Sequence, residues 1–180
     1  MLQLEIPERE LFDDRTMTFI NYKKESLQLE HSLVSLSKWE SNWCKPFLSN
    51  TPKTTEETID YIKCMTVTQN VRPEAYLHLP DDIFAQVDKY IHLPMTATWF
   101  SEKTTSAPSR EIITAELIYY WMISLTIPME CQKWHLNRLL TLIRVCNVKN
   151  QPQKKQNRAP NLKDRAALNR ARREQYNTTG

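Results

Sequence analysis

Apolar and polar residues alternate at the N-terminus of the chain. Leu2, Leu4 and Ile6 are separated by polar residues, which is the period of a half-buried strand. Residues 16–20 are rich in strand-forming types, and the charged stretch 13–15 before them is typical of a turn. These two patterns predict a small β-hairpin at the N-terminus.

Further along the chain the apolar period changes to that of a helix. Apolar residues recur at helical spacing from Lys24 to Trp43, and Pro46 ends the pattern. Thr54 with Glu57 forms a capping-box signature ahead of a second apolar stripe. A third helix is expected directly after Pro80, where two aspartates open its first turn.

Residues 110–147 are the most apolar part of the chain and predict a helical hairpin. Ser109 is expected to cap the first helix, and Pro128 suits the first turn of the second. Trp121 and Trp134 fall within these two helices. Because tryptophan is bulky and the segment is apolar, we expect both side chains in the core.

Glycine is almost absent, since the only one is Gly180. Phosphate-binding loops and dinucleotide fingerprints need glycines, and so does a nucleophile elbow, so these sites are excluded. Hairpin turns and bulges use glycine, whereas helix interiors disfavour it. We therefore expect a mainly α fold, a compact helical domain with a small N-terminal β element and a basic C-terminal tail.

Charge divides the chain into a body and a tail. The formal net charge is +3, and residues 149–180 hold nine Lys or Arg against two acids. The tail therefore carries +7, and the remaining 148 residues carry −4. We expect a helical body over 1–148. Over 149–180 we expect a basic linker and a helix, 161–176, that becomes ordered on a partner.

Two groups of residues are candidates for partner contacts. Trp99 lies beside a polar loop and is the tryptophan most expected to be partly exposed. The basic tail could neutralise phosphates or meet an acidic protein surface, through Lys154, Lys155, Arg158, Arg165, Arg170, Arg172 and Arg173. Composition leaves both kinds of partner open, although the single tail aromatic, Tyr176, offers little for base stacking.

No motif identifies a catalytic or metal site. Cys131 and His135 are four residues apart and would share one helical face, but zinc would need two more ligands. No second close pair of cysteine or histidine accompanies them, so a buried cysteine beside a hydrogen-bonded histidine is the favoured interpretation. We expect no enzymatic activity, no metal and no organic cofactor.

The sequence also indicates the cellular compartment of the protein. The four cysteines are far apart, and the N-terminus lacks the basic start and apolar core of a signal peptide. The longest uncharged stretch, 117–129, is shorter than the roughly 20 residues that span a bilayer. We expect a cytosolic protein with reduced thiols and no membrane partner.

Three segments carry a resemblance that covers nearly the whole chain: 27–48, 94–150 with PMTATWF at its start, and the closing ALNRARREQYNTTG. They resemble the tail assembly chaperones of tailed bacteriophages. Members of that family are made during tail morphogenesis, are thought to bind the tape measure protein and are absent from the finished virion. The family has no catalytic motif, so the resemblance implies no active site and carries over no individual functional residue.

The resemblance implies a non-catalytic protein-binding role in the host cell cytoplasm. The expected partners are the tape measure protein and other tail proteins, and self-association stays open. The alternative hypothesis is a phage nucleic-acid-binding protein that acts through the basic tail.

Overall fold

The computed structural model describes residues 1–13, 17–77, 79–100, 112–150 and 158–176. Within these residues the chain is mainly α-helical, as its composition predicts, and its paired strands lie at the N-terminus. The contacts divide the chain into two units, Met1–Asn147 and Val148–Gly180. The first unit holds the strands and the hydrophobic core, and the second holds the basic residues of the tail.

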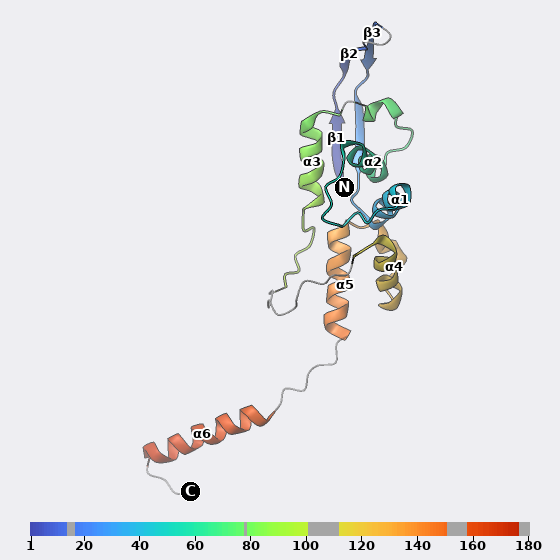
Figure 1. The fold of residues 1–180 in the computed structure, drawn as a ribbon. Coiled ribbons are helices and arrows are strands. Elements are labelled where there is room, and N and C mark those ends of the chain that lie inside the picture. The colour runs from blue at the N-terminus through green and yellow to red at the C-terminus, as the bar shows by residue number, and fades with distance from the viewer. Residues whose placement is uncertain (14–16, 78, 101–111, 151–157, 177–180) are drawn as a thin grey trace. The chain divides into compact units, whose positions relative to one another are not determined.

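The N-terminal strands form one antiparallel ribbon. β1 (Leu2–Ile6) pairs with β4 (Glu25–Leu29), and β2 (Arg9–Asp13) pairs with β3 (Thr18–Tyr22). Leu2 lies opposite Leu29 and Arg9 lies opposite Tyr22, so both pairs keep the same register. In Figure 1, β2 and β3 extend beyond the helices that flank β1 and β4.

The β1–β4 half of this ribbon belongs to the core. Leu4, Ile6, Leu27 and Leu29 are buried, so the predicted N-terminal β element is confirmed. The helical interpretation of residues 24–43 is wrong for its first part, because β4 occupies that segment. Its leucines alternate with polar residues as well as fitting a helical period, and pairing with β1 selects the strand.

The next two helices begin at clear caps. α1 (Leu33–Trp43) follows Ser32, whose side chain accepts a hydrogen bond from the backbone of Ser35. α2 (Thr55–Met65) carries the predicted capping box, because Thr54 and Glu57 each accept a hydrogen bond from the other's backbone N–H. α1 packs against α2, and the buried Trp39 indole donates to the Glu57 carbonyl at 2.8 Å.

A short 3₁₀ helix, η1 (Pro73–Tyr76), leads to α3 (Asp81–Ile91). α3 begins directly after Pro80, as the two aspartates predict. It buries Ile83, Val87 and Tyr90 and packs against β1 (Figure 1).

The predicted helical hairpin over 110–147 is wrong in its boundaries. α4 (Ala115–Ser124) is capped by Thr114, while Ser109 lies outside the described residues. Pro128 precedes a 3₁₀ helix, η2 (Met129–Lys133), and α5 (Leu136–Asn150) begins only afterwards. The break has a tertiary cause, because the Leu136 N–H donates to the His31 carbonyl at 2.7 Å. Both α4 and η2 pack against α1.

Two tryptophan assignments also change. Trp121 and Trp134 are half-buried at the edge of the core, whereas Trp39 is fully buried within it. Trp134 follows η2 at the break before α5, where the guanidinium of Arg138 covers its ring at 4.1 Å. The centre of the body is therefore the contact of α1 with its neighbours, not a hairpin of α4 and α5.

The second unit contains α6 (Arg158–Tyr176), which begins three residues earlier than the predicted tail helix. Pro160 stands in its first turn, where the missing N–H removes no helical hydrogen bond. The ordering of this helix on a partner stays a prediction.

Candidate protein-binding surfaces

Trp99 lies on an open surface of the first unit, as its position beside a polar loop predicts. Its side chain is 84% exposed. It belongs to the segment Pro94–Phe100 that follows α3, and this segment has no helix or strand of its own. An exposed indole removes a large apolar area from water only when a partner covers it, so Trp99 is a candidate contact residue.

Trp99 borders a hollow of about 590 Å³ that we call the Trp99 groove. One wall is the segment 94–100, and the other wall is one face of α5, formed by Asn137, Leu140, Thr141 and Arg144. Asn137 stands three and four residues before Leu140 and Thr141, and Arg144 stands four and three residues after them, which places all four on the same side of a helix. The groove mixes apolar surface with hydroxyl, amide and guanidinium groups.

The groove is held in place by a polar anchor. The Asn137 side-chain amide donates to the Ile91 carbonyl at 2.9 Å and to the Leu93 carbonyl at 2.8 Å. Both carbonyls lie at the C-terminal end of α3, so this one amide joins α5 to the chain that leads into Pro94. On the groove's other side, the Arg144 guanidinium lies over the Phe100 ring at 4.2 Å from its centroid.

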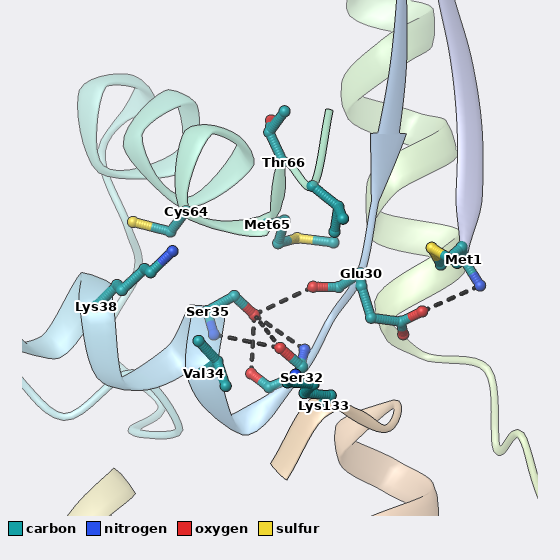
Figure 2. A pocket seen from close by; sticks show the side chains of 11 residues that line it. Met1, Glu30, Ser32, Val34, Ser35, Lys38, Cys64, Met65, Thr66 and Lys133 are labelled. Atoms are coloured by element: carbon teal, nitrogen blue, oxygen red, sulfur yellow. Dashed lines mark hydrogen bonds and ion pairs between the residues drawn. The ribbon is translucent and has the colours of Figure 1, made fainter. Parts of the chain in front are cut away.

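A second hollow, of about 460 Å³, lies beside the start of α1 (Figure 2). Its polar groups are largely engaged, since the Ser35 hydroxyl donates to the carbonyls of Glu30 and Ser32. Glu30 in turn accepts from the Tyr90 hydroxyl at 2.8 Å. Two lysines, Lys38 and Lys133, add positive charge at its edge. This hollow offers a ligand few unpaired polar groups.

A third surface is the β2–β3 end of the ribbon. Phe12 and Phe19 lie opposite each other, with ring centroids 5.0 Å apart in an edge-to-face arrangement. Both rings and the nearby Met17 are exposed. The pattern of residues 16–20 predicts a strand, but it gives no signal that these side chains lie away from the core.

The basic candidates belong to the second unit, whereas Trp99 belongs to the first. On α6, the side chains of Arg165, Arg170, Arg172 and Arg173 are exposed. Arg158 is the first residue of α6. Lys154 and Lys155 lie outside the described residues.

The pair Cys131 and His135 does not share one continuous helix as predicted. Cys131 lies in η2, and His135 lies in the break before α5. Both are buried, and burial raises the pKa of the Cys131 thiol. The Nε2–H of His135 donates to the Tyr90 carbonyl (3.1 Å), and burial lowers the pKa of its imidazole. Among the described residues, no three His, Cys, Asp or Glu side chains are grouped to hold a metal ion.

Sequence patterns gave no sign that a second histidine joins His135. The ring of His31 lies edge-to-face with that of His135, with centroids 5.1 Å apart, and its Nδ1 is 2.5 Å from the Tyr61 hydroxyl. Burial, and then the neighbouring His135, lower the pKa of His31 to about 3. Burial raises the pKa of Tyr61, so its hydroxyl stays protonated beside a neutral imidazole, and the His31 tautomer sets which of the two groups donates.

Another buried polar group was also missed. Glu40 lies on α1, and its two carboxylate oxygens accept from the backbone N–H groups of Phe47 and Ala115, each at 2.7 Å. The helical period places position 40 beside Trp39, but no local pattern identifies these two donors. Glu40 thereby joins α1 to the loop after it and to the first turn of α4.

No protein-family model matches the sequence, and no curated protein or solved structure matches it either. None of the helices in the described ranges is long and apolar enough to span a bilayer. The proposals that follow therefore depend on the surfaces described above and on the sequence resemblance.

Proposed function

We propose that this protein is a non-catalytic tail assembly chaperone of a tailed bacteriophage that binds the tape measure protein during tail morphogenesis. The observation that carries the proposal is the Trp99 groove, where an exposed indole borders a hollow on a well-packed body. Exposed apolar surface beside a concavity is typical of protein-binding sites. The resemblance of residues 27–48, 94–150 and the closing segment supplies the class of partner.

The buried titratable groups also favour binding over catalysis. A nucleophilic cysteine needs a lowered pKa and access to substrate. Burial instead raises the pKa of Cys64 to about 11 and also raises the pKa of Cys131. His31 and His135 are buried and hydrogen-bonded within the core, which suits a structural role.

The proposed mechanism is the temporary covering of apolar surface. A tape measure protein is long, and its helices expose apolar faces before the tail tube surrounds them. Binding at the Trp99 groove would shield such a face in the host cytoplasm and release it during assembly. The chaperone would then be absent from the mature virion.

Co-expression tests this proposal. The tape measure protein should be soluble and should co-purify with the wild-type chain, and both effects should weaken in the Trp99→Ala variant. Lys133→Ala, which changes an exposed residue outside the Trp99 groove, serves as the control. The proposal is wrong if the solubility of the tape measure protein does not depend on this protein.

A second candidate function is nucleic-acid binding through the tail. It is favoured by the exposed arginines of α6, because arginine side chains pair well with phosphate groups. Protein binding through an acidic surface would use the same residues, and the salt dependence described in the Discussion separates the two.

A further inference from the structure

The Trp99 groove contains a cation, Arg144, that is oriented by an aromatic ring. Arg144 is exposed and makes no ion pair with any residue that the structure describes. Its guanidinium instead lies over the Phe100 ring at 4.2 Å. Stacking on an aromatic ring uses the flat face of a guanidinium and leaves its N–H donors free at the edges.

That geometry suits a carboxylate. A guanidinium donates two parallel hydrogen bonds to a carboxylate, and such charge-assisted pairs are stronger than neutral ones. The stack on Phe100 limits the rotation of Arg144 before any ligand arrives, so less side-chain entropy is lost on binding. Among the described residues that line the groove, Arg144 is also the only charged one.

The rest of the groove is suited to an apolar side chain. Trp99 is exposed on the segment 94–100, and Leu140 is half-buried on the facing wall of α5. Thr96 and Thr141 add hydroxyl groups along the same hollow. A ligand that places a carboxylate on Arg144 would therefore meet apolar surface within the same hollow.

We infer that the Trp99 groove binds a segment of the client protein in which an Asp or Glu stands close to a large apolar residue. The carboxylate pairs with Arg144, and the apolar side chain packs against Trp99 and Leu140. This inference rests on the proposed function, because it names the chemistry of the client segment. Charge complementarity carries it, since the groove presents Arg144, which makes no ion pair with any residue in the described ranges.

The chain provides a matched control for Arg144. Arg138 lies on the same helix, is exposed, and stacks on an aromatic ring, with its guanidinium 4.1 Å from the Trp134 centroid. It does not line the Trp99 groove. Arg138→Glu therefore repeats the charge change and the loss of a ring contact outside the proposed site.

The direct test uses two fluorescein-labelled peptides of fifteen residues, one of mixed Leu and Glu and one with Gln in place of Glu. Fluorescence anisotropy should show the full-length protein binding the Glu peptide about ten times more tightly, as a charge-assisted pair allows. Arg144→Glu should abolish this preference, and Arg138→Glu should retain it. Trp99→Ala should lower the affinity for both peptides by about tenfold. If Arg144→Glu fails to fold, Arg144→Gln replaces it with the same expectation.

Three results would overturn the inference. An equal loss of the preference for the Glu peptide in Arg144→Glu and Arg138→Glu would mean that the peptide is attracted by the general positive charge of the protein. No preference for the Glu peptide would mean that Arg144 does not select a carboxylate. A change in oligomeric state of Trp99→Ala, with peptide affinity unchanged, would mean that a second copy occupies the groove.

Co-purification with the tape measure protein separates this inference from the proposed function. If the tape measure protein still binds Trp99→Ala and Arg144→Glu as well as the wild type, the chaperone proposal stands and the groove inference fails. If the Glu peptide binds as expected but the tape measure protein never co-purifies, the groove inference stands and the proposed client is wrong.

Discussion

The buried histidine pair predicts how stability depends on pH. His31 is neutral in the folded protein, because burial lowers its pKa to about 3. In the unfolded chain its pKa returns to about 6.5. Between these values the unfolded state binds a proton that the folded state does not bind. The contribution of His31 is therefore complete above pH 6.5 and is lost as the pH falls toward 3.

The magnitude follows from the size of the shift. Each pH unit below 6.5 removes about 1.4 kcal/mol of folding free energy through His31. At pH 5 the loss is about 2 kcal/mol, which is a large share of the stability of an ordinary domain. The pKa of His135 is also lowered, so this residue adds a loss in the same direction.

The perturbation that isolates His31 is His31→Asn, which keeps a polar atom near Tyr61 but does not titrate. The variant should be less stable than the wild type at pH 7.5, because the side chain is smaller. The difference between the two proteins should shrink by about 2 kcal/mol between pH 7.5 and pH 5. Urea unfolding at four pH values measures this difference.

Asn147→Ala serves as the control, since Asn147 is exposed and its amide does not titrate. It should keep the pH dependence of the wild type. The reasoning is refuted if His31→Asn and the wild type lose the same free energy on acidification. That result would mean that His31 is protonated in the folded state at pH 5.

Three further predictions concern packing, a buried carboxylate and the tail. Leu139→Ala should cost about 2–5 kcal/mol by chemical denaturation because it opens a cavity in the core, whereas the exposed Lys133→Ala should stay within about 0.5 kcal/mol. Glu40→Gln should cost about 1–3 kcal/mol, because an amide cannot accept at both positions and one buried N–H loses its partner, while the exposed Glu116→Gln should be nearly neutral. Deleting 151–180 should remove any steeply salt-dependent affinity for duplex DNA, since each phosphate contact contributes a log-log slope of about −0.9. A chaperone should show only weak, non-specific nucleic-acid binding, so submicromolar, sequence-dependent binding at physiological salt would contradict the primary proposal.

Local patterns predicted the elements whose causes are local. The capping box of Thr54 and Glu57 and the start of α3 after Pro80 depend on neighbours in sequence, and both are present. The leucines of β4 fit both a helical and a strand period, and only pairing with β1 selects the strand. The late start of α5 has a similar origin, since Leu136 donates to the distant His31 carbonyl instead of continuing η2.

Of the residues that form the Trp99 groove, only Trp99 could be predicted from the sequence. The position of Trp99 beside a polar loop predicts its exposure. The helical period places Asn137 and Arg144 on one face of α5, but nothing local says that Phe100 and its neighbours cover that face. The charge of the tail predicts its arginines as contact residues, whereas the role of Arg144 is recognisable only once α5 and the segment 94–100 are placed together.

Asn137 provides the last prediction, because it couples the fold to the groove. Its amide joins the carbonyls of Ile91 and Leu93 to α5, so it fixes the chain entering the segment 94–100. Asn137→Ala should cost about 1–3 kcal/mol through the two lost hydrogen bonds. It should also weaken binding of the Leu and Glu peptide, because Trp99 and Phe100 lose their position opposite Arg144. Anisotropy and urea unfolding on the same variant measure both effects.

Asn147→Ala, an exposed change on the same helix, is the matched control and should alter neither quantity. Lower stability with unchanged peptide affinity would mean that the segment 94–100 holds its place without Asn137. A preorganised groove requires the opposite result, since a stacked Arg144 selects a carboxylate only while Phe100 stays beneath it. If Asn137→Ala does weaken peptide binding, the Asn137 hydrogen bonds and the Arg144 guanidinium are both needed for the groove to bind the peptide.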